Sequence, residues 1–177
     1  MTRIGIALGF LLLVTTGTLA QDEALPDSVA QAYLAYEDAI ASQNYRAAIS
    51  AAATAWQAAR DEEIDPELVG VLASNYARLA LAFGEFDHAY DAWRSAAEIS
   101  DDTNAPPLER AFRWYSASLA AFAGGESDDA YQCSLRSVRA EEAAAATIGP
   151  ALSGDIHYMA AVTSAQQGRL TLLPHHA

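Results

Sequence analysis

The feature that most constrains the fold of this chain is a short pattern that occurs three times at a fixed spacing. Residues 84–93 read GEFDHAYDAW, and an earlier copy at residues 43–52 reads QNYRAAISAA. A later copy at residues 125–134 reads GESDDAYQCS, so an alanine falls at the same point each time, at Ala48, Ala89 and Ala130. An evenly spaced repeat of this kind predicts a small structural unit that recurs along the chain and stacks on its neighbours.

Turn-forming residues follow the same spacing. Three prolines and three glycines are spaced in the same way: the first interval equals the spacing of the alanines, and the second interval is longer by two residues. The prolines and the glycines therefore show the same two-residue insertion. Both residue types interrupt regular structure, and their order predicts where each unit begins and where it turns. The two series are Pro66, Pro107 and Pro150, and Gly84, Gly125 and Gly168.

The composition favours helices in every unit. Alanine is the commonest residue and has the highest helix propensity, and β-branched residues are sparse after residue 20. We therefore expect each unit to be a pair of helices joined by a turn at the glycine. The first helices are predicted at 27–42, 66–83, 107–123 and 151–166, and the second helices at 45–60, 86–99 and 127–146.

Local signals support these boundaries. Asp65 is suited to cap a helix, and it precedes a proline at the first helical position and the acidic Glu67 in the first turn. Gly84 and Gly125 are placed to end first helices in a left-handed conformation, which glycine adopts at little cost. The segments DEEIDP, DDTNAPP and TIGP predict loops between the units.

The start of the second helix resembles that of a tetratricopeptide repeat. In that family a glycine turn is followed by an aromatic residue and, three residues later, by an alanine, as in Gly84, Phe86 and Ala89. The family period is about 34 residues, which is shorter than the period here, and bulky Tyr36 stands where a small residue is expected. The chain thus resembles a divergent member. Small residues at the family's positions of close helix contact are Ala48, Ala55, Ala77, Ala89, Ala96, Ser118, Ala130 and Ser137.

The resemblance implies an all-α, right-handed α-solenoid of about three and a half helix hairpins, or about seven helices. The last helix is then a capping helix, over which the leucines of the C-terminal tail 169–177 are expected to fold. A generic array of α-helical hairpins is the alternative architecture. The implied domain is 27–168, with units 27–65, 66–106, 107–149 and 150–168.

The first twenty residues have the character of a secretory signal peptide. Arg3 gives a positive end, residues 4–14 are continuously apolar, and residues 18–20 offer small side chains before an acidic segment. The apolar run is shorter than the ~20 residues that a membrane-spanning helix needs. We therefore predict cleavage after residue 20, a short linker at 21–26 and a periplasmic location. An uncleaved membrane anchor is the alternative.

The charge of the chain bears on its partners. The formal net charge is −13, and all ten basic residues are arginines. Such a surface repels nucleic acid and anionic lipid, and it favours a basic protein or peptide partner. The simpler explanation is that the acidic residues keep an alanine-rich helical protein in solution. No later segment is apolar enough to predict a membrane span.

No arrangement of residues predicts catalysis or a cofactor. None of the four histidines stands at a metal-ligand spacing from a second ligand, and no glycine-rich phosphate loop precedes a helix. His157 aligns with Trp114, which favours packing over ligation. Cys133 aligns with small packing positions, so we expect a buried thiol, with an intermolecular disulfide as the alternative. We therefore expect a protein that is not an enzyme and holds no metal.

The predicted function is protein binding in the bacterial envelope. In tetratricopeptide arrays the first helices line a concave groove that holds peptides or partner helices. Carried over position by position, the resemblance implies a groove with tyrosines, which suit binding surfaces, and arginines that can hold carboxylates. Ordinary packing between helices is the alternative role for the tyrosines. The predicted groove residues are Tyr33, Glu37, Asn75, Arg78, Phe112, Arg113, Tyr115, Leu119 and Tyr158.

Two other functions stay open from the sequence. Some envelope proteins, including some energy transducers of the TonB type, join such repeats to a further domain, so this chain is alternatively a module of a larger machine. The second alternative is a self-assembling structural protein whose open solenoid ends stack on one another.

Overall fold

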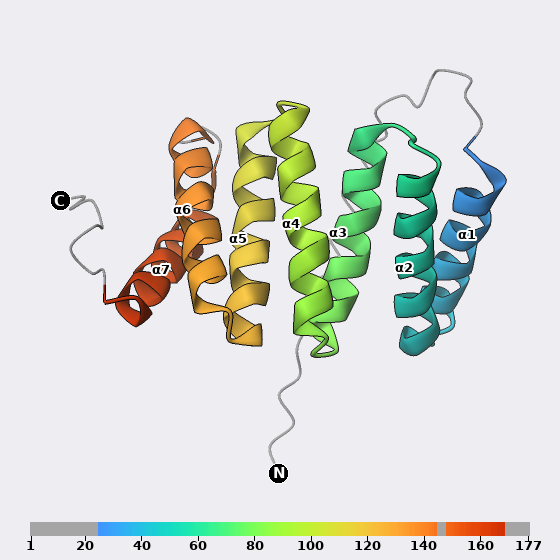
Figure 1. Ribbon diagram of the computed structural model, residues 1–177, viewed down its shortest axis with the longest axis horizontal. Helices are drawn as coiled ribbons and strands as arrows, with labels where there is room; N and C mark the ends of the chain where they lie inside the picture. The colour runs from blue at the N-terminus through green and yellow to red at the C-terminus, as the bar shows by residue number, and fades with distance from the viewer. Residues whose placement is uncertain (1–24, 145–147, 169–177) are drawn as a thin grey trace, which may run out of the picture.

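The computed structural model describes residues 25–144 and 148–168 (Figure 1). Within these residues the chain forms α-helices and no strands, which confirms the all-α prediction. The predicted signal peptide, most of the linker, the last two residues of the predicted helix 127–146 and the C-terminal tail lie outside the described residues. The helices are α1 (Asp27–Ala41), α2 (Tyr45–Asp61), α3 (Pro66–Ala82), α4 (Phe86–Asp102), α5 (Pro107–Gly124), α6 (Ser127–Ala144) and α7 (Pro150–Gln166).

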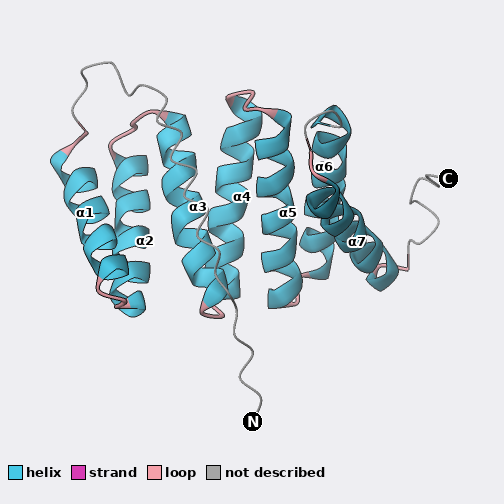
Figure 2. Cartoon of the chain, turned by 180° about the vertical axis from the view of Figure 1, so that it is seen from behind, coloured by secondary structure: helices cyan, strands magenta, loops and turns pink. Residues whose placement is uncertain are grey.

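Helices α1 to α6 stand side by side in one row, in the order of the chain, and α7 crosses α6 obliquely at the end of the row (Figures 1 and 2). Each helix packs mainly against the helices before and after it in the sequence, and α5 also contacts α7. This sequential packing defines an α-solenoid, in which each helix hairpin completes the core of the next. The helix boundaries agree with the predicted ones to within a few residues; the largest difference among the described ends is at α4, which ends at residue 102 rather than 99.

The backbone of the turns repeats with the sequence. The turns between paired helices each contain a residue with positive φ, and the spacing of these residues is the predicted one. Gln43 takes this conformation in the first unit, where the later units have glycine. The loops between units repeat in the same way, at Glu63 and Asn104, with φ of 51° and 52°. The residues at the turns within hairpins and after α7 are Gln43 (φ 57°), Gly84 (80°), Gly125 (88°) and Gly168 (64°).

The predicted cap at α3 is present. The Asp65 side chain accepts hydrogen bonds from the backbone N–H groups of Glu67 (2.8 Å) and Leu68 (3.2 Å), and Pro66 occupies the first turn. These bonds satisfy donors that the start of a helix otherwise leaves open. At the equivalent point of the next unit stands Pro106, so α5 begins without a side-chain cap.

The core consists largely of small side chains, which lets the helices approach closely. All eight of the small residues predicted at helix contacts are buried, with at most 1% of their surface exposed. Larger side chains fill the spaces between them, among them Trp93 and Trp114, each 2% exposed. Cys133 is buried as predicted, at 4% exposed, and burial together with the Asp129 carboxylate raises the pKa of its thiol to about 11.

Candidate functional site

Large apolar side chains are exposed mainly on the odd-numbered helices. Leu34 lies on α1, Val71 on α3, Leu108 and Phe112 on α5, and Tyr158 on α7. Among the described residues of the even-numbered helices, only Tyr45, the first residue of α2, is a large hydrophobic residue of comparable exposure. Most exposed positions of α4, by contrast, carry Asp, Glu, Arg or His. The two sides of the solenoid therefore differ in chemistry, and the odd-numbered helices form the more apolar one.

Exposed and half-buried residues recur along one face of each of the first three odd-numbered helices. Residues three or four positions apart share a face of a helix, as Val71, Asn75 and Arg78 do. The internal repeat relates Val71 to Phe112 and Arg78 to Leu119, so the same face recurs from unit to unit. We call this surface the odd-helix stripe. Its residues are Leu34, Glu37, Glu67, Val71, Asn75, Arg78, Leu108, Phe112 and Leu119.

Phe112 is the aromatic residue of the stripe. Its ring meets the ring of Trp93 on α4 edge to face, with the centroids 5.8 Å apart. Because Trp93 is buried, this contact holds one side of Phe112 in place while 39% of the residue stays exposed. Leu108 lies one turn away on the same helix face and is 38% exposed. Phe112 is therefore a partly fixed apolar side chain, which loses little conformational freedom on binding.

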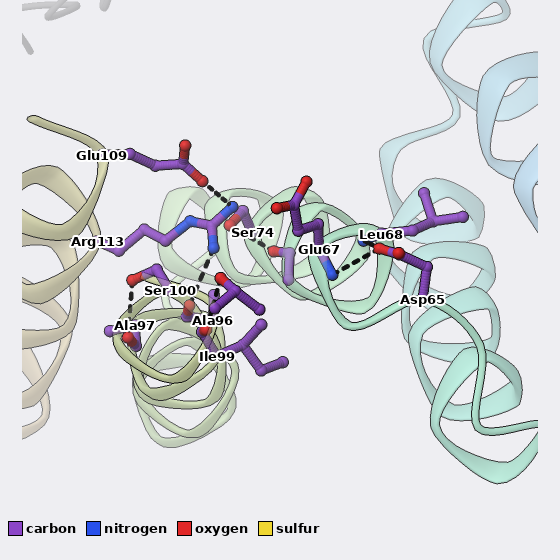
Figure 3. Close-up of polar contacts among 12 residues, drawn as sticks. Asp65, Glu67, Leu68, Ser74, Ala96, Ala97, Ile99, Ser100, Glu109 and Arg113 are labelled. Carbon is purple, nitrogen blue, oxygen red and sulfur yellow. Dashed lines mark hydrogen bonds and ion pairs between the residues drawn. The ribbon is translucent and has the colours of Figure 1, made fainter. Parts of the chain in front are cut away.

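Arg113, which the sequence placed in the groove, is buried and bonded within the chain (Figure 3). Its Nη1 donates a hydrogen bond to the backbone oxygen of Ala96 on α4 (3.0 Å), and its Nη2 pairs with the Glu109 carboxylate (2.6 Å). A Cβ at Gly70 on α3 would lie only 2.8 Å from Nη1, so the glycine makes room for the guanidinium. Burial lowers the pKa of Arg113, and the Glu109 and Glu67 carboxylates oppose that effect. The guanidinium ties α5 to α3 and α4 and is not presented on the surface.

The predicted groove residues of α1 and α3 lie closer to the surface. Tyr33 is half-buried, with its ring 5.8 Å from that of Tyr36, and Glu37 is exposed. Burial raises the pKa of the Tyr33 hydroxyl, and the neighbouring Glu37 carboxylate raises it further. Arg78 is exposed, and its charge partly offsets the effect of burial on the pKa of Tyr36. The structure thus brings Glu37 and Arg78 to the surface and leaves the tyrosines to pack between helices.

The remaining predicted residues are divided between the stripe and the end of the row. Asn75 and Leu119 are half-buried members of the stripe. Tyr115 is half-buried, and burial and the Asp155 carboxylate of α7 both raise the pKa of its hydroxyl. Its equivalent in the last unit, Tyr158, is 70% exposed on α7. Tyr158 therefore belongs to a different environment from Tyr33 and Tyr115, although the repeat aligns all three.

The sequence interpretation missed three apolar residues of the stripe: Leu34, Val71 and Leu108. A signal for one of them was available, because Val71 occupies the position in its unit that the predicted Phe112 occupies in the next. A second available signal was Gly70, a glycine inside a predicted helix, which often marks the close approach of another group. That glycine would have suggested that the side chain packed against it, which is Arg113, is buried and has a structural role.

The opposite side of the solenoid has a shallow hollow of about 510 Å³ between α2 and α4. Trp56 and Tyr76 line it, with their ring centroids 5.7 Å apart. Its arginines already have partners, since Arg60 lies over the Trp56 ring at 5.3 Å and Arg94 pairs with Glu98 at 2.9 Å. Such internally paired charges have little capacity to recognise a charged ligand.

The described residues contain no group of His, Cys, Asp and Glu side chains that could hold a metal ion. Over the same residues, no helix has the length and apolar character needed to cross a membrane. His157 instead pairs with Glu141 of α6, with Nε2 3.1 Å from the carboxylate oxygen.

By its fold the chain is a helical-repeat protein, an α-solenoid of stacked helix hairpins. Comparison with models of known protein families finds no match to the chain, and comparison with curated proteins finds no similar sequence.

Proposed function

We propose that the protein is an exported adaptor of tetratricopeptide type that binds another protein or peptide along the odd-helix stripe. The observation that carries this proposal is the segregation of exposed apolar side chains to the odd-numbered helices. Exposed apolar residues that are gathered on one face mark interaction sites more often than scattered ones do. In tetratricopeptide arrays the first helices of the hairpins, which are the odd-numbered helices here, line the binding groove.

The charges on the stripe suggest the character of the partner. Glu37 and Glu67 are exposed acids, and Arg78 is an exposed cation. An apolar segment with basic residues complements the two acids, and a carboxylate on the partner complements Arg78. The net charge of −13 adds long-range attraction for a basic partner.

A capture experiment tests the proposal. The mature chain, residues 21–177, is immobilised and exposed to an extract of the bacterial envelope, beside a variant with Val71→Ser, Arg78→Ala and Phe112→Ser. These positions are exposed, so the variant should keep its helicity, which circular dichroism checks. The proposal predicts that a specific protein is retained by the parent chain and lost by the variant, because the variant removes apolar area and one charge from the stripe.

A matched control variant changes an exposed aromatic residue outside the odd-helix stripe, at the start of α2. Tyr45→Ser removes an apolar residue that is 40% exposed, close to the 39% of Phe112. The proposal predicts that this variant retains the same protein as the parent chain. Equal loss of the captured protein in the stripe variant and in the control would place binding elsewhere and contradict the proposal.

The export step has its own test. The apolar run at residues 4–14 and the small residues before position 21 motivate the predicted signal peptide. When the protein is expressed in a bacterium, mass spectrometry of the periplasmic fraction should give the mass of a chain whose first residue is Gln21. A cytoplasmic protein that retains residues 1–20 would contradict the predicted location.

The alternative proposal is that the chain is a module of a larger machine in the bacterial envelope, which is also compatible with the fold. Helix-hairpin arrays end in surfaces on which a further element can stack. The genomic reading frame downstream of residue 177 distinguishes the two proposals, because a module requires further coding sequence in the same frame. The proposed binding surface is the same in both cases.

A further inference from the structure

The outer face of α7 is exposed and carries few charges. Tyr158, at 70%, is more exposed than any other large hydrophobic residue in the described part of the chain. Asp155 is the only acid or arginine in α7, a helix of 17 residues. In the row of helices α7 is last, and no described helix lies beyond it (Figure 2).

The internal repeat shows what this face lacks. Its last step relates Gly154, Tyr158 and Ala161 of α7 to Ala111, Tyr115 and Ser118 of α5. Ala111 and Ser118 have no exposed surface, whereas Gly154 is exposed and Ala161 is half-buried.

In α5, helix α6 provides the cover. Ser137 of α6 donates a hydrogen bond to the backbone oxygen of Ala111 (2.8 Å), and Ser118 donates one to that of Ala130 (2.7 Å). The equivalent face of α7 therefore has the form of a helix–helix contact, and the described part of the chain supplies no second helix for it.

Five exposed or half-buried residues of α7 form a regular seam. They are spaced alternately by three and four residues, which is the spacing that keeps a contact line on one side of a helix when two helices pack together. None of them carries a charge, although the chain as a whole has a net charge of −13. The seam consists of Ala151, Gly154, Tyr158, Ala161 and Ala165.

The seam is complementary to itself. Its one large residue, Tyr158, lies between small residues four positions before it and three positions after it. In an antiparallel pair of identical helices related by a two-fold axis, the alternating seam positions face one another. Each Tyr158 then inserts between Gly154 and Ala161 of the second copy, as a knob inserts into a hole. The five seam residues are uncharged, and the exposed Asp155 flanks the seam rather than lying in it. The contact therefore does not bury an unpaired ion at its centre.

We propose that the protein forms a two-fold dimer in which α7 of one copy packs antiparallel against α7 of a second copy. This dimer leaves the odd-helix stripe of α1, α3 and α5 free, so it is independent of the proposed adaptor function. It would place two stripes in one particle and double the number of partner sites. Linked sites of this kind raise the apparent affinity for a partner that is itself repeated or clustered.

Sedimentation analysis of the full mature chain, from micromolar to near-millimolar concentration, tests the dimer. The parent chain should shift from monomer to dimer as concentration rises. Higher salt should strengthen the dimer, because it screens repulsion between two acidic molecules. Tyr158→Arg should weaken dimerisation by about tenfold or more, since it removes the central residue of the seam and introduces a charge. Leu34→Arg, at an apolar residue of α1 that is 59% exposed, is the control and should leave it unchanged.

A second variant separates the loss of the dimer from misfolding. A Cβ added at Gly154 would meet no atom within 4 Å, so a larger residue fits the monomer and is also a better helix former. Gly154→Leu should raise the thermal midpoint of the monomer and still weaken the dimer, because it fills the space that Tyr158 of the second copy needs. A parent chain that stays monomeric at every concentration, as it would if the tail 169–177 covered the seam, would overturn the proposal. So would a dimer that both α7 variants leave intact.

Discussion

The two halves of the solenoid hold their helices together in different ways. In α1–α4 the small residues that the repeat places at helix contacts are buried alanines, and aromatic rings such as the Trp56–Tyr76 pair also contact each other in this half. In α5–α7 hydroxyl groups occupy equivalent buried positions and form hydrogen bonds between helices. The repeat pairs Ala77 of the first half with Ser118 of the second, and Ala96 with Ser137. All four residues are at most 1% exposed.

The two halves therefore use different kinds of contact at equivalent positions between helices. Contacts between methyl groups permit close approach and have little directional preference. A hydroxyl that bonds to a backbone oxygen of the next helix adds direction, and it must keep that bond because its burial without one is costly. The interface between α6 and α7 contains hydrogen bonds between side chains instead. There Ser134 bonds with Thr163 (2.9 Å), and Glu141 accepts a hydrogen bond from Ser153 (2.7 Å).

The largest expected effect concerns the core of the second half. Trp114 is 2% exposed, its indole N–H donates to Asp101 (3.0 Å), and the Arg136 guanidinium lies over its ring at 4.4 Å. Trp114→Ala should lower the free energy of unfolding by about 3–5 kcal/mol, because it leaves a large cavity. Urea unfolding followed by circular dichroism measures the change. A loss below about 1 kcal/mol would show that Trp114 does not organise this half.

A pair of conservative changes compares the tryptophans of the two halves. Trp114→Phe removes a hydrogen bond and should cost about 1–2 kcal/mol. In Trp56 the indole nitrogen is buried and has no hydrogen-bond partner among the described residues. Trp56→Phe should therefore change the free energy of unfolding by less than about 0.5 kcal/mol, since the loss of apolar area is offset by removal of an unsatisfied group. Equal losses of unfolding free energy in Trp114→Phe and Trp56→Phe would show that the two tryptophans do not differ in this way.

A hydroxyl exchange sharpens the comparison further. Ser118→Ala should cost about 1 kcal/mol, the usual net value of one hydrogen bond. The reverse change, Ala77→Ser, places a hydroxyl where the repeat puts the Ala89 backbone oxygen in the position of the Ala130 oxygen. We expect it to be neutral within about 0.5 kcal/mol, because the new group finds an equivalent acceptor. A loss above about 2 kcal/mol for Ala77→Ser, again from urea unfolding, would mean that the two halves are not interchangeable at this position.

The smallest expected effect is on the dependence of stability on pH. Burial, with the Asp129 carboxylate second, raises the pKa of Cys133 from 9.0 to about 11. The protonated thiol is thus favoured in the folded state, so its contribution to stability is complete below pH 9 and is lost as pH rises from about 9 to about 11. Cys133→Ala should flatten the stability curve in that range. The native thiol should also react slowly with a thiol reagent at pH 8, and rapid reaction would contradict its burial.

Much of the fold was predictable because the repeat is expressed in residues with strong local preferences. Pro66 and Asp65 begin α3, and the glycines at 84 and 125 end helices with positive φ, as predicted. The left-handed Gln43 and Glu63 were less evident, because residues with a Cβ seldom adopt this conformation. For these two positions, the equivalent residues of the next unit, Gly84 and Asn104, predict the left-handed conformation more clearly.

The site was less predictable, because exposure depends on what the next unit covers. Arg113 follows Phe112 directly in the sequence, yet one is buried and the other exposed. The difference arises from Gly70, which lies in the preceding unit and leaves room for the guanidinium. Tyr115 and Tyr158 align in the repeat but differ in exposure, since among the described residues only Tyr115 is followed by a further unit. The spacing of residues in the sequence does not predict which residues of a neighbouring unit will cover a side chain.

Site-specific photocrosslinking in the bacterial envelope tests the central claim, that the odd-numbered helices carry the binding surface. A photoreactive phenylalanine analogue replaces Phe112 on α5 in one variant and Tyr45, the first residue of α2, in another; these aromatic positions are 39% and 40% exposed. We expect a discrete crosslinked product with another protein from position 112 and none from position 45. Products from position 45 alone, or equal products from both, would contradict it.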